Sequence, residues 1–223
     1  MHSALYSQTS DGLSENMTTN YLSPFLFTNT LLPLMTTTSR LPDADVRIVN
    51  LTSVVHARPK NPRFDSLEAL NASFGDDGMT LYGKLHRLGY TKLATMLYSK
   101  ELQKRLDADN VPIIVTSPHP GTFLTARKYS FAAEGCNTVV GRFPGGSILI
   151  FLMRYLLPPV SQSGDASVFA AASPEVRKRA GEFKGAYLMP VGKITPSSAD
   201  AQNPQLAREL WETSEKQLAA LGL

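Results

Sequence analysis

Two short runs of apolar, β-branched residues constrain this chain more than any other feature of its sequence. The runs are VRIVNLTS at residues 46–53 and VPIIVT at residues 111–116, and a long helical pattern lies between them at residues 86–106. Compact runs of this kind are typical of strands that are buried on both faces of a parallel sheet. Strands that alternate with helices join through right-handed crossovers. The order of segments therefore predicts an α/β fold with a parallel sheet.

The remaining segments continue this alternation. Residues 14–35 carry apolar side chains at the spacing of one helix face, and Pro24 is expected to kink or locally unwind that helix. The other predicted elements are a loop at 58–78 that is long enough for a binding loop or lid, a helix at 164–172, a strand at 186–190 and a helix at 204–221. A chain of 223 residues is expected to form a single domain, residues 1–223.

Charge and cysteine content exclude several classes of protein. Lys and Arg number 22 against 19 Asp and Glu, a formal net charge of +3 that is too small and too evenly spread for a nucleic-acid surface. The single cysteine, Cys136, rules out a disulfide framework and a multi-cysteine metal site. His56, His86 and His119 fall in separate segments, so we interpret them as surface or loop residues and expect no metal site. We expect an intracellular, cytoplasmic protein.

The most apolar segment is SILIFLMRYLL at residues 147–157. It is half the length of the roughly 20 residues that a membrane-spanning helix needs, and Arg154 interrupts it. The N-terminal residues are polar and carry no Lys or Arg, so no targeting signal is expected. We therefore expect no transmembrane span. The segment is predicted to be a helix that lines an apolar pocket or makes peripheral contact with a membrane.

Five stretches, in order along the chain, resemble the second half of the short-chain dehydrogenases/reductases: DGLSENMTTNYLSPFLFTN, RIVNLTS, YTKLATMLYSKEL, SPHPGTFLT and YLMPVGK. The resemblance covers nearly the whole chain and is strongest to the retinol-dehydrogenase-like enzymes of fungal secondary metabolism. It implies the C-terminal portion of a Rossmann-like, doubly wound parallel sheet. The sequence lacks the family's glycine-rich TGxxxGxG turn and its NAG motif. The resemblance therefore implies an incomplete sheet without the nucleotide-binding half of about 90 residues.

The resemblance also implies a chemistry. In the family, a nicotinamide cofactor exchanges a hydride with a carbonyl or alcohol, and a tyrosine is the general acid and base. By position, the serine that holds the substrate oxygen is Ser53, the lysine beside the tyrosine is Lys92, and the asparagine that supports a relay water is Asn20. The residues that the resemblance assigns to the cofactor are Lys92, Pro120, Gly121, Thr122 and Thr125.

The general acid is the point at which the chain departs from the family. The family tyrosine lies one helical turn before the lysine, and that position is Leu88. Tyr90 lies about 200° around the helix from Lys92 and should face the other way. Tyr82 is expected to precede the helix. Because a leucine cannot transfer a proton, the donor would be a water acting through Lys92, or a repositioned Tyr82.

Two functions of different classes follow. The first is an NADP- or NAD-dependent oxidoreductase that interconverts a ketone and a secondary alcohol on a hydrophobic small molecule, in secondary-metabolite biosynthesis. The second is a catalytically inactive remnant that binds a partner, as a homo- or hetero-oligomer, through the helices that the family uses for dimerisation. An incomplete reading of the gene is a third interpretation. The residue that selects between NADP and NAD in the family falls in the missing half, so the cofactor choice stays open.

Overall fold

The computed structural model describes residues 6–74, 81–121, 162 and 164–223. Its three strands are β1 (Arg47–Val49), β2 (Ile114–Pro118) and β3 (Ala186–Leu188). Its longer helices are α2 (Ser23–Ser39), α4 (Leu81–Ala108), α7 (Asp165–Ala172) and α10 (Pro204–Ala220). Its shorter helical segments are α1 (Glu15–Met17), the π-helical turn η1 (Thr18–Leu22), η2 (Val54–Ala57), α3 (Leu67–Leu70), α8 (Pro174–Lys178), α9 (Ala180–Phe183) and η5 (Asp200–Gln202).

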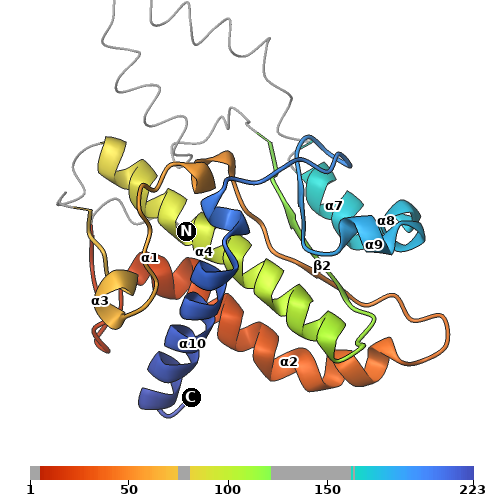
Figure 1. The fold of residues 1–223 in the computed structure, drawn as a ribbon, viewed down its shortest axis with the longest axis horizontal. Helices are drawn as coiled ribbons and strands as arrows, with labels where there is room; N and C mark the ends of the chain where they lie inside the picture. Colours follow the sequence, from red (N-terminus) through yellow and green to blue (C-terminus); the bar gives the residue numbers. More distant parts are fainter. Residues whose placement is uncertain (1–5, 75–80, 122–161, 163) are drawn as a thin grey trace, which may run out of the picture.

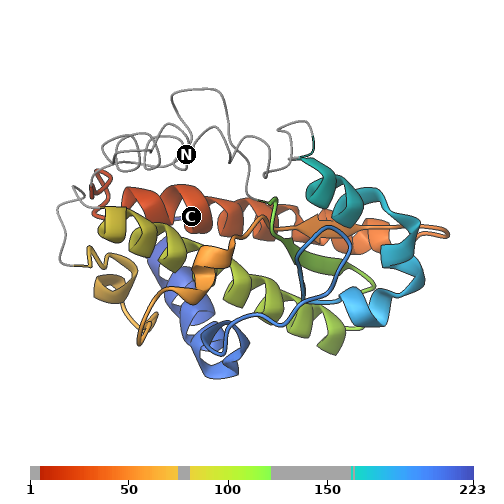
Figure 2. The ribbon, with the colours of Figure 1, turned by 90° about the horizontal axis from the view of Figure 1, so that it is seen from above.

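The strands form a parallel sheet in the order β1-β2-β3. Helix α4 packs on one face of the sheet, with α10 packed against it, and α7 and α9 lie on the other face. Figures 1 and 2 show this arrangement, in which α7, α8 and α9 are set apart from α2, α4 and α10 by the strands. The described residues thus confirm the predicted α/β class with a parallel sheet.

Side chains along β2 alternate between the two cores. Ile113 and Val115 belong to the larger core with α4 and α10, whereas Ile114 packs with Phe183 and Leu188 in the smaller core. Every residue of β2 is buried, as the sequence predicted. The first strand is shorter and less buried than predicted, because β2 is its only partner among the described residues and only Ile48 is buried.

The N-terminal helix contains the predicted local unwinding. It occurs as the π-helical turn η1, directly before Pro24. Proline has no N–H to donate to the carbonyl group four residues earlier, so the regular α-helical hydrogen bond to Asn20 cannot form there. The helix then continues as α2 to Ser39, beyond the predicted end and through Pro33.

The other helical predictions differ from the structure mainly in their boundaries. Helix α4 begins at Leu81, so the prediction that Tyr82 precedes the helix is wrong. The predicted elements at 164–172, 186–190 and 204–221 are confirmed as α7, β3 and α10. The segment 147–157 and Cys136 lie outside the described residues. Within the part of the chain that the structure describes, no helix has the length and apolar character needed to cross a membrane.

Candidate active site

Ser53 and Lys92 come together beside the first half of α4. The Lys92 ammonium donates a hydrogen bond to the carbonyl oxygen of Leu51, with Nζ and O separated by 2.9 Å. In the opposite direction, the Thr52 hydroxyl donates to the carbonyl oxygen of Lys92 at 3.2 Å. These two contacts tie the segment just before Ser53 to one turn of α4. The segment that ends at Ser53 therefore lies against Lys92, and the catalytic roles of Ser53 and Lys92 stay predictions.

The surroundings of both groups suit a reaction with a polar substrate atom. Ser53 has an extended backbone, and its hydroxyl does not cap η2. Burial lowers the pKa of the Lys92 ammonium below its ordinary value. A lysine with a lowered pKa is a stronger acid than one in water, so it is better suited to proton transfer near neutral pH.

Asn20 reaches the same turn of α4 from the opposite side of the site. It lies in η1, and its side-chain amide donates to the hydroxyl of Thr91, the residue before Lys92, at 3.2 Å. The Thr91 hydroxyl donates in turn to the carbonyl oxygen of Leu88 at 2.9 Å. Asn20 therefore contacts α4 with its side chain rather than capping the backbone next to Pro24.

The position of the family tyrosine is filled by Leu88, which is only partly buried. Tyr90 points away from this face, as predicted: its phenol lies within hydrogen-bond distance of two backbone carbonyls, that of Arg63 in the loop after η2 and that of Ala69 in α3. Burial raises the pKa of that phenol. Tyr82 lies near the start of α4, about 15 Å along the helix axis from Lys92 at 1.5 Å per residue. Neither tyrosine replaces the missing acid.

Gly89 explains how closely α4 approaches the serine segment. A Cβ atom at this position would lie 2.5 Å from the backbone oxygen of Val55 in η2, a separation that real Cβ atoms do not show. Only glycine permits this contact between the helix and η2. The signal was present in the sequence, because a glycine inside a helix costs about 1 kcal/mol relative to alanine and usually has a packing reason.

Of the residues assigned to the cofactor, Pro120 and Gly121 follow β2 at the same end of the sheet as Ser53. Gly121 has φ +102°, a backbone conformation that favours glycine, so the chain can turn there without a side chain in the way. Thr122 and Thr125 lie outside the described residues. Lys92 and this turn fit the nicotinamide and ribose end of a dinucleotide. The sequence contains no glycine-rich turn to hold the pyrophosphate.

The interpretation of the histidines as surface or loop residues is wrong for His56 in η2 and His86 in α4, whereas His119 does lie in the loop after β2. The side chains of His56, His86 and His119 are all buried. His56 and His119 lie close enough that a positive charge on His56 would lower the pKa of His119, although the two are far apart in the sequence. Sequence patterns missed this because both residues follow strands whose ends meet only in the folded sheet.

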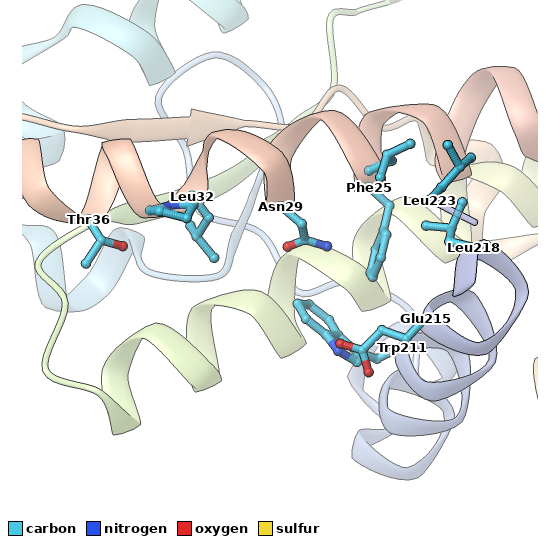
Figure 3. A pocket seen from close by; sticks show the side chains of 10 residues that line it. Phe25, Asn29, Leu32, Thr36, Trp211, Glu215, Leu218 and Leu223 are labelled. Atoms are coloured by element: carbon cyan, nitrogen blue, oxygen red, sulfur yellow. The ribbon is translucent and has the colours of Figure 1, made fainter. Parts of the chain in front are cut away.

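A hollow lies away from these residues, between α2 and helix α10. It has a volume of about 530 Å³, and Figure 3 shows Phe25 and Trp211 in its wall, with Asn29 and Glu215 at its edge. None of the predicted site residues lines it. The hollow is therefore distinct from the serine–lysine site.

Several known proteins are similar to this chain in sequence. No family model matches the chain. It is 41% identical over 210 residues to a short-chain dehydrogenase/reductase from Armillaria gallica, covering 94% of this chain and 62% of that protein. It is 32% identical to a short-chain dehydrogenase/reductase from Colletotrichum higginsianum, with 97% of this chain and 52% of that protein covered. It is 28% identical to mouse retinol dehydrogenase 12, with coverages of 94% and 55%.

A solved structure supports the fold alone. A crystal structure of an uncharacterised protein from Mycobacterium paratuberculosis matches with a TM-score of 0.55 at 24% identity, and it covers 95% of this chain and 61% of that protein. The chain spans only about half to three fifths of the length of the fungal and mouse relatives. The sequence matches bear out the predicted resemblance: over more than nine tenths of its length the chain is similar to members of the short-chain dehydrogenase/reductase family.

Proposed function

We propose that this protein is an oxidoreductase that interconverts a ketone and a secondary alcohol on a hydrophobic small molecule, with NADP or NAD as the hydride carrier. One observation carries the proposal. Asn20 and the segment that ends at Ser53 are both hydrogen-bonded to the turn of α4 that carries Lys92. Asn20 bonds to Thr91, and the two residues before Ser53, Leu51 and Thr52, bond to Lys92. A fold that had lost all demand for this chemistry would have no need to hold these groups together.

Each residue has a distinct part in carbonyl reduction. The Ser53 hydroxyl donates to the carbonyl oxygen of the substrate and orients it. The nicotinamide, when bound, supplies the hydride to the carbonyl carbon. Lys92 would hold the nicotinamide ribose, and its positive charge stabilises the negative charge that grows on the substrate oxygen. Asn20 fixes the position of Thr91 and holds a water beside α4.

The proton comes from the Lys92 ammonium through that water. One hydride and one proton convert the ketone to the alcohol, and the resulting neutral amine takes a proton back from solvent. The lowered pKa of Lys92, which burial causes, supports this role. General acid catalysis of this kind contributes roughly 10²–10⁴-fold when a matched group is in place. We therefore expect slow turnover in a chain where Leu88 replaces the tyrosine.

Adding the missing phenol tests the proposal. Position 88 is one helical turn before Lys92 and faces the same side, so Leu88→Tyr should raise kcat by about 100-fold. Leu88→Phe is the matched control, because it adds the ring without the hydroxyl and should leave kcat unchanged. Turnover would be followed as NADPH oxidation with a panel of aryl and alicyclic ketones. Equal, undetectable turnover in all three proteins would contradict the proposal.

The cofactor and the substrate class are further parts of the proposal. The relatives from fungi are named short-chain dehydrogenases/reductases, and the mouse relative is named a retinol dehydrogenase, which supports a hydrophobic alcohol or ketone as substrate. We propose NADP over NAD, a place in secondary metabolism and a cytoplasmic location as parts of the same function. Binding of NADPH and NADH, measured by fluorescence at millimolar concentration, tests the first point. Tighter binding of NADH would overturn it.

A further inference from the structure

His56 makes two hydrogen bonds that determine which of its ring nitrogens carries the proton. The backbone N–H of Ser198 donates to Nε2 at 3.1 Å. A backbone N–H can only donate, so Nε2 is the acceptor and carries no hydrogen. Nδ1 lies 2.7 Å from the carbonyl oxygen of Ser53, and it must therefore carry the hydrogen and donate it. The geometry defines a neutral imidazole with its proton on Nδ1.

These bonds connect His56 to segments that are far apart in the sequence. Its ring lies at 5.1 Å and 70° to the ring of Tyr187 in β3. Ser198 belongs to the segment that leads into η5, whereas Ser53 ends the segment that follows β1. The backbone N–H of His56 also donates to the Ser53 carbonyl, at 3.0 Å. The buried His56 ring therefore contacts β3 and the segment before η5, and it also donates to the carbonyl oxygen of Ser53.

A second histidine acts on the preceding peptide group. The His119 ring donates to the backbone carbonyl of Thr52, and the Thr52 N–H donates to the carbonyl of Pro118 at 3.1 Å. Nδ1 of His119 is buried and has no hydrogen-bond partner among the described residues. The peptide groups on both sides of Ser53 are thus held by histidines from different elements.

We propose that His56 is a positioning residue for Ser53, which it holds by donating from Nδ1 to the Ser53 carbonyl while accepting from Ser198. The inference rests on the proposed function, in which the Ser53 hydroxyl orients the substrate oxygen. It assigns a role to a residue that does not itself touch the reacting atoms. A misplacement of about 1 Å at a reacting group can lower a rate by roughly 100-fold, so the fixed backbone matters for the reaction.

The arrangement requires a neutral ring. A proton on Nε2 would face the Ser198 N–H, and both groups would then be donors. The titratable and charged groups that act on His56 are Lys100 from α4, His119 after β2 and Tyr187 from β3. Burial and the positive charge of Lys100 lower the pKa of His56, which keeps the ring neutral at physiological pH. The activity should fall in acid when His56 gains its second proton.

Two substitutions separate the two bonds. His56→Asn keeps an amide donor near the position of Nδ1, whereas His56→Gln keeps an acceptor near the position of Nε2. We expect kcat in the asparagine variant to stay within about twofold, and kcat in the glutamine variant to fall by about 10- to 100-fold with KM little changed. The acid limb of the kcat profile should move in both variants. Tyr187→Phe is the control, since it keeps the ring that packs on His56.

A measurement on the full chain without substrate keeps the role of His56 testable if no turnover is found. Long-range ¹H–¹⁵N NMR spectra should show His56 protonated on Nδ1 and bare on Nε2 at pH 7. The backbone signals of Ser53 should shift more in the glutamine variant than in the asparagine variant. This result together with no turnover in any protein would refute the proposed function alone. A protonated Nε2, or equal shifts in both variants, would overturn the role of His56.

Discussion

Two sets of contacts along α4 differ in kind, a polar set around Lys92 in its first half and an aromatic set around Tyr98 in its second half. Around Thr91 and Lys92, polar side chains bond to the backbone of the serine segment and to Asn20. Around Tyr98 and Arg105, the contacts are aromatic. Trp211 of α10 stacks on Tyr98 at 5.7 Å, and the Arg105 guanidinium lies 4.2 Å from the centre of the Trp211 ring.

The difference separates two tasks within one helix. Directional hydrogen bonds fix the positions of individual groups, but each contributes only about 1 kcal/mol net to stability. Burial of large rings contributes more free energy and places atoms less strictly. Changes in the second half of α4 and its partners should therefore lower stability and leave the site intact, whereas changes in the first half should affect the geometry of the site.

The largest expected effect is the loss of stability when the Trp211 ring is removed. Trp211→Ala removes a ring that is 6% exposed and packs on Phe25 and Tyr98, and it should lower the free energy of unfolding by about 3–5 kcal/mol. Urea unfolding followed by circular dichroism measures this. Trp211→Phe should lower the free energy of unfolding by less than half as much. NADPH binding, measured on the protein that remains folded, should be unchanged, and a large loss of binding would break the separation of tasks.

The next effect is on the site side. Gly89→Ala places a Cβ atom 2.5 Å from the Val55 oxygen, so α4 and η2 must move apart. Overpacking of this kind costs about 1–3 kcal/mol, which exceeds the gain in helix propensity. Gly181→Ala is the matched control, because a Cβ atom in that helix meets nothing within 4 Å. It should stabilise the protein slightly. A neutral Gly89→Ala variant would show that the close approach is not required.

A decrease in pH should destabilise the region around the buried histidines more than the aromatic contacts of Trp211. Burial lowers the pKa values of His56, His86 and His119 in the folded state. The unfolded chain therefore binds more protons as the pH falls below about 6.5, and stability decreases in that direction. Each proton excluded by folding gives a slope of at most about 1.4 kcal/mol per pH unit. Urea midpoints at pH 7.5 and 5.5 test this; equal midpoints would count against neutral, buried histidines.

The smallest effect concerns the cation on the aromatic side. Arg105→Met removes the guanidinium over Trp211 and should cost about 0.5–1 kcal/mol. Arg105 also bonds to Glu101 at 2.9 Å. Lys104→Met serves as the control, because Lys104 faces the same carboxylate at 3.9 Å and does not lie over the Trp211 ring. Equal losses in the two variants would assign the effect to the carboxylate and not to the ring.

The sequence predicted most of the fold because its signals are local. The β-branched run before Pro118 and the periodic pattern of α10 depend on neighbouring residues, and both elements formed where expected. The assignment of Asn20, Ser53 and Lys92 to one site came from the family resemblance and stays a prediction. The burial of His56 and the contact at Gly89 depend on how α4 lies against η2. Residues that are distant in sequence create that environment. Local patterns therefore revealed neither the burial of His56 nor the segment that Gly89 contacts, although a glycine inside a helix does signal a packing contact.

The π-helical turn η1 makes the site sensitive to the length of the chain as well as to its composition. A π-helical turn contains one residue more than the α-helical turn that it replaces. Removing Tyr21 or Leu22 would restore an α-helix and rotate everything before it, Asn20 included, by about 100° relative to α2. Asn20 would then no longer face Thr91. The placement of this asparagine is thus encoded by the number of residues that precede Pro24, and a deletion there would disconnect it while leaving every site residue in the sequence.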